Sequence, residues 1–442
     1  MVEAAFYGDD FTGSTDALLQ YERLGLHGAL LVELPPLDEL RKLAAQYDVI
    51  GVAGIARSLP PDEQEAEIRP ILSALRELDP RVVQYKICST ADSSPVLGSL
   101  GRALEVGRSL FGPAPVPVLA AQPELGRYTV FGHHFAAEAG VVHRLDRQPT
   151  MANHPATPMH ESDLRRHLAA QTDLRITSLE LTGYGELGAR YAEIDGDVVV
   201  LDALTDADLV AVGRAVLAGG NGGPLFAMGS GGLSRALGTA LTDGGRRSGV
   251  VRHGVGDSAP EQVLVVSGSQ SRRTAEQIEL AVRAGWTSLT LDADAAHLAV
   301  EALRAGAPGV VVHTGRADGV PGAVGHTSGL PGSGAHAAGG IGAGVLPLLA
   351  EGLAEVVRAV AQGTEVRKVI VAGGDTSGRV LRELDITAVE LATDPTQDQD
   401  GFGPGVVLCR TLAADPWLDG LLVILKGGQV GSVELFEVLR VS

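Results

Sequence analysis

The sequence contains few cysteines and no concentrated metal-binding motif. Only Cys88 and Cys409 occur among its 442 residues, too few for a disulfide framework or for a zinc site without histidines at ligand spacing. The 12 histidines are scattered, and the HExxH pattern of zinc proteases is absent. We therefore predict neither a disulfide-stabilised domain nor a resident metal site.

Long apolar runs and an excess of basic residues are lacking as well. No window offers about 18 uninterrupted apolar residues, and the N-terminal MVEAAFYGDD has no basic region typical of a secretory signal. Lys plus Arg number 35 against 54 Asp plus Glu, a formal charge of −19, so the surface repels nucleic-acid phosphates and anionic lipids. We expect a cytoplasmic protein that binds neither nucleic acid nor membrane; its oligomeric state stays open, a homo-oligomer included.

The common phosphate loop GxxxxGK[ST] is also absent, which removes the main support for a P-loop NTPase. One GxGxxG occurs at 183–188 after a predicted strand, and Asp202 ends the next strand, as in dinucleotide-binding folds. Only residues 189–195 separate its last glycine from the turn at Gly196, which is shorter than a usual crossover helix. An NAD(P)-dependent dehydrogenase of a hydroxy acid is therefore an alternative and not the leading hypothesis.

The sequence does contain a repeated alternation of short apolar runs, glycine- or serine-bearing turns and segments of helical periodicity. This pattern is typical of βα units around a parallel sheet and predicts an α/β fold. The predicted strands lie near 2–7, 29–34, 48–55, 82–87, 116–121, 175–181, 198–203, 224–228, 263–267, 287–291, 309–314, 366–372 and 421–426, with helices such as 14–24 and 161–171.

We predict two domains, 1–245 and 258–442, each built on a mainly parallel sheet with flanking helices. The polar, glycine-rich residues 246–257 suit a linker between them. A second glycine-rich segment, 315–344, is too long for an ordinary loop and is expected to cover or border a site.

The segment GDDFTGSTDALL at 8–19 follows the first predicted strand. It places Asp9 and Asp10 at the carboxyl end of that strand, where open α/β sheets bind ligands. Two adjacent carboxylates there suit hydroxyl recognition or base chemistry. The alternative is that one of them only caps the next helix, although one cap explains only one aspartate.

The segment YKICSTADSSPVLGSLGRAL at 85–104 places Lys86 at a strand end, followed by Ser89 and Asp92 before a helix. A cation, hydroxyls and free amides at a helix N-terminus suit a small anion such as a carboxylate. The alternative is that the segment is only a serine-rich loop that caps the helix. Arg57 ends another predicted strand and could form a bidentate carboxylate contact, whereas alone it would more often be a surface arginine.

Three glycine-rich turns follow predicted strands in the second half of the chain. Their amides, gathered along one sheet edge, would cradle phosphates, although any one of the turns alone could be a simple tight turn. In the helix predicted after the first turn, Thr274 and Gln277 have the spacing of a helix capping box. The candidate nucleotide-binding residues are Ser267, Ser269, Gly373, Gly374, Asp375, Thr376, Gly427 and Gly428.

In this order the motifs resemble the four-carbon acid sugar kinase family over nearly the whole chain. They are GDDFTGSTDA, ARSLP, YKICSTADSSPVLGSLG, NHPATPMHESDL, VVSGSQSRRTAEQI, AGGDTSGRVLREL and KGGQVGSVELF. The resemblance implies ATP-dependent phosphorylation of 3-oxo-tetronate, threonate, erythronate or a related acid. It also implies an N-terminal sugar-acid domain, a C-terminal nucleotide domain and a reaction in the cleft between them. The last motif and residues 392–407 differ from the usual pattern of the family. These differences leave open which sugar acid is the substrate, and branched acids such as 3-oxo-isoapionate are among the candidates.

Phosphoryl transfer needs in-line positioning, charge neutralisation and a base near the acceptor hydroxyl, which implies ATP with Mg²⁺. We expect Arg57 and Lys86 to hold the substrate carboxylate, and Asp9 and Asp10 to bind hydroxyls. Asp10 is the expected base, and Asp375, which equally suits a magnesium-water ligand, is the rival. A non-catalytic sugar-acid sensor, which would lack nucleotide affinity, is the remaining alternative.

Overall fold

The chain forms two compact units, Met1–Val251 and Arg252–Ser442, each of which is described by itself. The computed structural model describes residues 2–154, 156–220, 222–242, 261–315, 346–392, 402, 406–428 and 430–442, without the side chains of Leu346 and Asp375. The expected linker 246–257 and almost all of the glycine-rich segment 315–344 lie outside the described residues.

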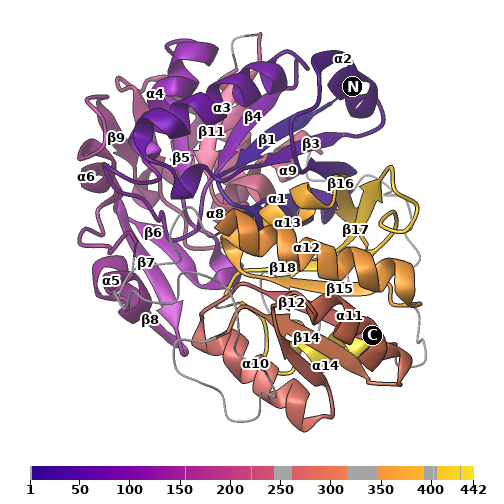
Figure 1. Ribbon diagram of the computed structural model, residues 1–442. Coiled ribbons are helices and arrows are strands. Elements are labelled where there is room, and N and C mark those ends of the chain that lie inside the picture. Colours follow the sequence, from indigo (N-terminus) through magenta and orange to yellow (C-terminus); the bar gives the residue numbers. More distant parts are fainter. Residues whose placement is uncertain are drawn as a thin grey trace. The chain divides into compact units, whose positions relative to one another are not determined.

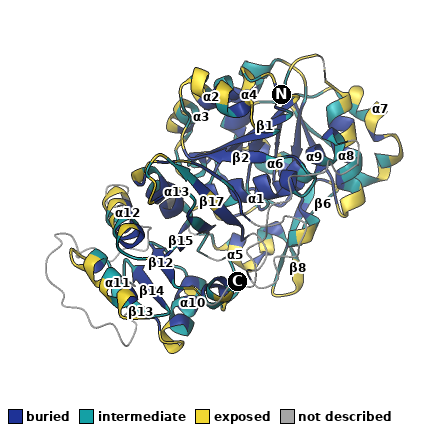
Figure 2. Ribbon diagram, turned by 90° about the vertical axis from the view of Figure 1, so that its right-hand side faces the viewer, coloured by how far each residue is buried: buried dark blue, intermediate teal, exposed yellow. Residues whose placement is uncertain are grey.

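The first unit is built on a parallel sheet with the strand order β2-β3-β1-β4-β11-β5-β10-β9. Every residue of its central strands β1, β3 and β4 is buried, as expected for a parallel sheet covered on both faces (Figure 2). The strands are β1 (Ala4–Gly8), β2 (Gly28–Leu31), β3 (Val49–Ala53), β4 (Val82–Lys86), β5 (Val116–Leu119), β9 (Ile176–Leu179), β10 (Val198–Leu201) and β11 (Leu225–Gly229).

Two groups of helices cover this sheet (Figure 1). Helix α1 packs against α9, which packs against α8, while α3 packs against α4. Right-handed crossovers place these two groups on opposite faces, because the chain leaves β1 in one direction along the sheet and crosses to β4 in the other. The helices are α1 (Phe11–Glu22), α2 (Leu37–Ala44), α3 (Pro61–Arg76), α4 (Leu100–Phe111), α5 (Pro149–Ala152), α6 (Leu164–Ala169), α7 (Leu187–Ala192), α8 (Asp206–Ala218) and α9 (Gly231–Leu241).

A small antiparallel sheet follows β5 in the first unit. It consists of β6 (Arg127–Val130), β7 (His133–Glu138) and β8 (Val141–Arg144). Ala136, Leu145, Met151 and Met159 form a separate hydrophobic cluster beside it.

The second unit has the strand order β13-β14-β12-β15-β18-β17-β16, in which β17 runs antiparallel to both of its neighbours, β18 and β16, and the other neighbouring strands pair in parallel. Helices α11, α12 and α13 pack side by side, and α10 packs against α14. The elements are β12 (Val263–Ser267), α10 (Arg272–Arg283), β13 (Thr287–Thr290), α11 (Ala295–Arg304), β14 (Gly309–His313), α12 (Leu346–Gly363), β15 (Lys368–Ala372), α13 (Gly374–Glu383), β16 (Ile386–Leu391), β17 (Leu408–Ala413), β18 (Leu422–Lys426) and α14 (Leu435–Val441).

Each sheet contains a point at which the chain reverses its direction of travel along the sheet. In the first unit the chain continues from β1 to strands on one side of the sheet and from β4 to strands on the other. In the second unit the same relation holds for β12 and β15. Open α/β sheets bind ligands at such switch points.

The α/β prediction with mainly parallel sheets and flanking helices is confirmed. The sequence analysis did not predict β6 to β8, β16 or β17. The predicted helix 14–24 begins earlier, at Phe11, because Asp10 caps it. The proposed capping box of Thr274 and Gln277 is wrong, since both lie inside α10 and Ser271 is its N-cap.

The GxGxxG at 183–188 does not form a dinucleotide-binding turn. It spans the 3₁₀ helix η4 (Leu181–Glu186) and the start of the short α7. The Asp202 carboxylate accepts hydrogen bonds from the backbone amides of Phe131 and Gly132 at 2.6 and 2.9 Å, which gives it a structural role.

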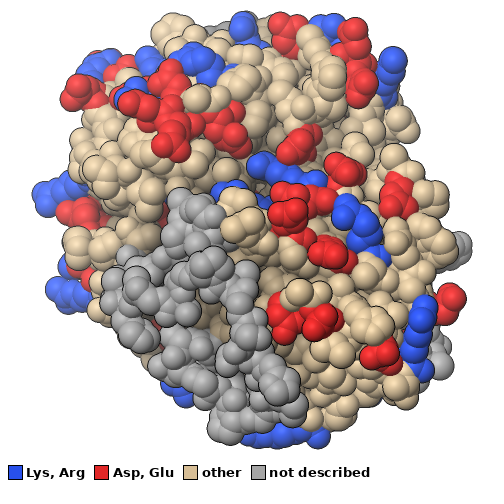
Figure 3. Space-filling view, viewed as in Figure 1, with Lys and Arg blue, Asp and Glu red and all other residues tan. Residues whose placement is uncertain are grey.

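Among the described residues, no helix combines the length and the apolar character needed to cross a bilayer. The face of the molecule in Figure 3 intersperses acidic and basic side chains with uncharged ones.

Candidate functional site

The predicted sugar-acid residues converge at the carboxyl ends of three neighbouring strands of the first unit. Asp9 follows β1, Arg57 lies in the 3₁₀ helix η1 (Ala56–Ser58) after β3, and Lys86 ends β4. Backbone hydrogen bonds join these segments: the Asp9 amide donates to the Lys86 carbonyl at 3.0 Å and the Arg57 amide to the Asp9 carbonyl at 3.1 Å. The three loops therefore form one cluster at the switch point of the sheet.

Arg57 binds both aspartates. Its Nη2 and Nε donate to Asp9 Oδ1 and Oδ2 at 2.6 and 3.3 Å, and its Nη1 donates to Asp10 Oδ2 at 2.9 Å. Asp10 also caps α1, because its Oδ1 accepts from the Gly13 amide at 2.9 Å. The capping alternative thus holds for Asp10, in addition to its place in the cluster.

Asp9 is buried, with 2% of its surface exposed. Burial raises the pKa of Asp9 from 3.8 to about 6, although Arg57 opposes the rise, and the nearby Asp10 carboxylate raises it further. Asp9 therefore exchanges its proton close to neutral pH, in the range useful for acid–base chemistry.

Lys86 is 2% exposed and lies beside the first turn of α1. Its Nζ donates to the Ile87 carbonyl at 2.8 Å, and a Cβ atom on Gly13 would stand 2.9 Å from it. Within the described part of the chain, no carboxylate lies at salt-bridge distance from this ammonium group. A buried cation with unused donor positions suits an anionic ligand.

The segment after Lys86 is held by side chains from other elements. Thr90 Oγ1 donates to Asp92 Oδ1 at 2.5 Å and lies 2.9 Å from Cys88 Sγ. Burial and the Asp92 carboxylate raise the pKa of Cys88 to about 11, so the thiol stays protonated. The negative charge of Asp92 also acts on Arg57, which brings Asp92 into the cluster.

Ser89 contacts its neighbours through its backbone carbonyl group. Its carbonyl oxygen lies 2.7 Å from His134 Nε2, and Thr129 Oγ1 lies 2.9 Å from His134 Nδ1. Burial lowers the pKa of His134 to about 4, so the ring is neutral at pH 7. A neutral ring donates to Ser89 from Nε2 and accepts from Thr129 at Nδ1.

Two further groups at this edge were missed by the sequence analysis. Asp16 is buried in α1, and its Oδ2 accepts from Gln122 Nε2 at 3.1 Å. Burial raises its pKa while the positive charge of Lys86 lowers it, so Asp16 and Lys86 interact. A Cβ atom on Gly231 would stand 2.2 Å from Asp16 Oδ2, which places the turn between β11 and α9 at the same edge.

That turn, residues 229–232, reads GSGG after a predicted strand. It has the same strand, glycine-rich turn and helix order as the turns of the second unit, and this signal could have found it. Asp16 carried no such signal, because its neighbour Gln122 lies 106 residues away in the sequence.

In the second unit, hydrogen bonds join the three glycine-rich turns at the carboxyl ends of β12, β15 and β18. The Gly268 amide donates to the Ala372 carbonyl at 3.0 Å, and the Gly373 amide to the Lys426 carbonyl at 2.9 Å. The turns also approach closely, since a Cβ atom on Gly268 would stand 2.4 Å from Thr376 Oγ1. The sequence-predicted gathering of these turns is therefore present in the fold.

The start of α13 provides free backbone amides. Its N-cap, Gly373, has φ +128°, a conformation that favours glycine, and no side chain caps the helix. A Cβ atom on Gly374 would meet no described atom within 4 Å, so space is open over this residue as far as the structure describes its surroundings. Asp375 belongs to the same turn, and its side chain lies outside the described residues.

Hydroxyl groups surround the carbonyl of Gly428. It accepts from Ser271 Oγ and from Thr274 Oγ1, the latter at 3.0 Å. Thr274 Oγ1 lies 3.1 Å from Ser269 Oγ, and Ser267 Oγ accepts from the Ser269 amide at 3.3 Å. This network links the first and third turns. Gly427 continues the third turn, and its carbonyl accepts from the Val430 amide at 3.2 Å.

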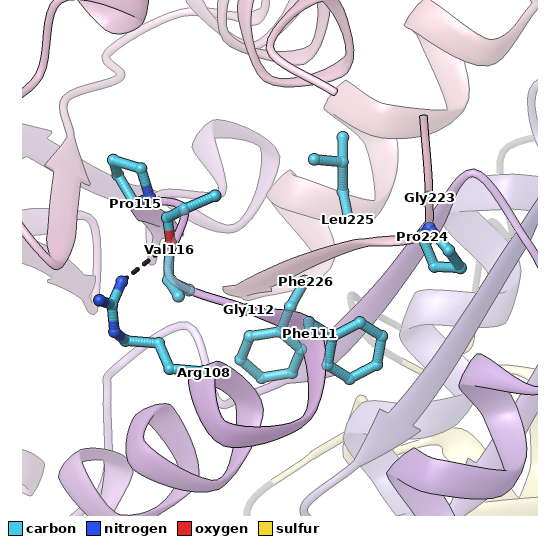
Figure 4. Close-up of a pocket in the computed structure, with 10 residues that line it drawn as sticks. Arg108, Phe111, Gly112, Pro115, Val116, Gly223, Pro224, Leu225 and Phe226 are labelled. Carbon is cyan, nitrogen blue, oxygen red and sulfur yellow. Dashed lines mark hydrogen bonds between the residues drawn. The ribbon is translucent and has the colours of Figure 1, made fainter. Parts of the chain in front are cut away.

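Two cavities of about 200 and 300 Å³ in the first unit lie away from these clusters. The smaller is bordered by the end of α4 and the amino ends of β5 and β11 (Figure 4). The rings of Phe111 and Phe226 stack beside it, with their centroids 5.2 Å apart. Neither cavity is lined by a predicted site residue. Across the described residues, no three His, Cys, Asp or Glu side chains are arranged to hold a metal ion.

Two family models match this chain: a sugar-binding N-terminal domain over residues 4–237 and a nucleotide-binding C-terminal domain over residues 264–436. The suspected relationship is confirmed by this pair of domains together with the relatives of the whole chain. The chain belongs to the four-carbon acid sugar kinase family.

Two relatives extend along almost the whole chain. The 3-oxo-isoapionate kinase of Paraburkholderia graminis is 36% identical over 99% of this chain and 93% of the relative. The 3-oxo-tetronate kinase of Methylobacterium radiotolerans is 30% identical over 97% of this chain and 96% of the relative.

Two solved structures share the fold. A Salmonella typhimurium protein has a TM-score of 0.72 at 22% identity, covering 99% of this chain and 98% of that one. A Haemophilus influenzae protein has a TM-score of 0.66 at 21% identity, covering 99% of both chains.

Proposed function

We propose that this protein is an ATP-dependent kinase that phosphorylates a hydroxyl group of a short sugar acid. The substrate class comprises four-carbon acids such as 3-oxo-tetronate, threonate or erythronate and branched acids such as 3-oxo-isoapionate. The observation that carries the proposal is full-length similarity to a 3-oxo-isoapionate kinase, at 36% identity over 99% of this chain. The relatives include kinases of a branched acid and of a linear acid, so the proposal names a class of substrates and not one particular acid.

In the first unit, Lys86 would bind the substrate carboxylate, because its buried ammonium group has unused donors. Asp9 and Asp10 would accept hydrogen bonds from substrate hydroxyls, with Asp10 as the base that removes the proton during transfer. Arg57 would hold both carboxylates in place through the hydrogen bonds it makes to them. Its direct contact with the substrate carboxylate stays a prediction, as do the roles of Ser89 and Asp92.

In the second unit, the backbone amides at the start of α13 and in the turns after β12 and β18 would bind the phosphates of ATP. The open space over Gly374 leaves room for a phosphate group. Mg²⁺ would enter as part of the substrate, in complex with ATP. The described residues include no group of three His, Cys, Asp or Glu side chains that could hold the ion alone, and Asp375, the predicted magnesium-water ligand, has its side chain outside them.

Two assignments remain predictions at this point. Asp375 is the rival base, and the reaction is expected in a cleft between the two domains. The non-catalytic sensor predicts that sugar acids bind and that ATP does not, so nucleotide binding separates it from the kinase.

The proposal is tested by incubating the purified full chain with ATP, Mg²⁺ and a panel of four- and five-carbon sugar acids while measuring ADP release. We expect ADP release that depends on one acid or a small group of acids, with a phosphate ester formed in equal amount. Absence of transfer to every acid, with both ligands bound, would contradict kinase activity. Oxidation of an acid with NAD(P)⁺ would favour the dehydrogenase instead.

A further inference from the structure

Lys426 ends β18 beneath the glycine-rich turns of the second unit, and its side chain has 0% of its surface exposed. Its Nζ donates to Thr274 Oγ1 at 2.9 Å, and Thr274 donates to the Gly428 carbonyl at 3.0 Å. The Lys426 carbonyl also accepts from the Gly373 amide at 2.9 Å. The amine therefore lies beside Thr274, in the network that links the turns after β12 and β18, and the Lys426 backbone is hydrogen-bonded to the turn after β15.

Among the side chains that the structure describes, no carboxylate lies at salt-bridge distance from this amine. A buried ammonium ion without a partner is costly, which favours the neutral amine. Burial, and secondarily the positive charge of Arg273, lowers the pKa of Lys426 from 10.5 to about 7. The network around it, made of hydroxyls and a carbonyl, accommodates a neutral amine as donor.

Lys368 of the same sheet shows the contrasting arrangement. It is also 0% exposed, but its Nζ donates to the carbonyls of Leu439 and Ser442 at 3.2 and 2.6 Å. Glu261 Oε2 lies 3.6 Å away. Lys368 thus has the acceptors that Lys426 lacks, and it serves as a matched control.

Among the side chains that the structure describes, no other charged group near β18 forms a salt bridge with Lys426. Arg273 of α10 pairs with Glu276 at 3.4 Å and is the charged side chain that acts on the amine. Lys368 and Arg410 lie in register with Leu422 at the opposite end of β18. The remaining charged residues on α13, which packs against β18, are Asp375, Arg379, Arg382 and Glu383.

We propose that Lys426 is a charge-compensating residue of the nucleotide site, and that its amine takes up one proton from solvent when nucleotide phosphates bind at the three turns. The negative phosphates would supply a counter-ion to the buried amine, so the ammonium form becomes favourable on binding. Lys426 acts through Thr274 and the turn amides, which makes it a positioning residue. The inference rests on the proposed nucleotide binding.

Linkage gives the size of the effect. At about pH 8 a lysine with a pKa of about 7 is roughly nine-tenths neutral, so binding takes up close to one proton per nucleotide. By the same linkage, the affinity for nucleotide falls as pH rises above about 7, approaching tenfold per pH unit.

The test is calorimetric titration of the full chain with ADP and Mg²⁺ at about pH 8, in buffers of different ionisation enthalpy such as Tris and HEPES. The nucleotide itself holds no proton there, because the last phosphate pKa is about 6. The dependence of the observed enthalpy on buffer enthalpy measures the protons taken up. Wild type, Lys426→Met and Lys368→Met are compared, with thermal unfolding as the check on folding.

We expect uptake of about 0.5–1 proton in wild type and in Lys368→Met, and none in Lys426→Met, which should still bind ADP but with flattened pH dependence. Nucleotide binding without proton uptake in wild type would overturn the inference and leave the kinase proposal standing. Equal uptake in Lys426→Met would assign the proton to another group. No nucleotide binding by folded wild type would overturn both proposals.

Discussion

Arg57 binds Asp9 through two hydrogen bonds of 2.6 and 3.3 Å, although 48 residues separate them in the sequence. Asp9 is the more buried partner, with 3% of its side chain exposed against 20% for Arg57. Loss of one partner from such a pair leaves the other charge buried without compensation. The arginine predicted as a substrate ligand therefore also supports the two aspartates beside it.

Arg57→Met is expected to lower the free energy of unfolding by about 3–5 kcal/mol, because Asp9 then loses its guanidinium partner. Urea unfolding measures the change. The double variant Asp9→Asn/Arg57→Met is the control, since it removes the orphaned charge and should recover part of the loss. An equal loss in the single and double variants would mean that the unpaired Asp9 charge is not the cause of the loss.

Asp9 also predicts a pH dependence of stability. Its pKa in the folded protein, about 6, lies above the ordinary value of 3.8, so the folded state holds the proton more tightly. Its stabilising contribution is present below about pH 4 and is lost as pH rises through about 6, by up to about 3 kcal/mol.

We expect Asp9→Asn to remove this decline, measured as the difference from wild type in urea unfolding between about pH 4 and pH 7. Asp38→Asn is the control, because the Asp38 side chain is 90% exposed. The same pH dependence in Asp9→Asn as in wild type would assign the effect to another group.

Substitutions of Asp10 should separate its effect on the free energy of unfolding from its effect on kcat. Asn at position 10 can still accept from the Gly13 amide, so Asp10→Asn should keep the helix cap, whereas Asp10→Ala should cost about 1 kcal/mol. If Asp10 is the base, both variants lose about 10²–10⁴-fold in kcat. Near-normal kcat in Asp10→Asn, with a large loss in Asp375→Asn at unchanged ATP affinity, would transfer the role to Asp375.

Gly373 and Gly374 are adjacent, but alanine substitutions at the two positions should have different effects on stability and on ATP binding. Gly373 has φ +128°, so Gly373→Ala is expected to destabilise the fold by about 1–3 kcal/mol. Gly374 lies in α13 with open space over it, so Gly374→Ala should leave the melting temperature unchanged or slightly raised while weakening ATP binding. Thermal unfolding with and without ATP separates the two effects. Equal loss of stability in both variants would contradict the assigned backbone roles.

The central strands and the turns after them could be predicted from the sequence for a physical reason. Strands buried on both faces are mostly apolar, so β1 and β12 are visible as apolar runs, and β4 as an apolar run interrupted by Gln84. The positions of Asp9 and Lys86 follow directly, since each stands at the end of such a run.

Other parts could not be predicted because they depend on contacts distant in sequence. The small sheet has charged and half-buried residues, as in Arg127–Val130, and lacks an apolar run. The partners of Arg57 and of Asp16 come from other loops, 48 and 106 residues away. The low pKa of Lys426 arises from burial, which no local motif encodes.

The most direct test of the account is the pair of Michaelis constants in two variants, Lys86→Met in the first unit and Gly374→Val in the second. The account predicts that Lys86→Met raises KM for the sugar acid at least about tenfold with KM for ATP unchanged, because a charge-assisted contact is lost. It predicts the reverse for Gly374→Val, in which the branched side chain occupies the space of a phosphate. A rise in KM for ATP in folded Lys86→Met, or an unchanged KM for ATP in folded Gly374→Val, would contradict the division of substrates between the two domains.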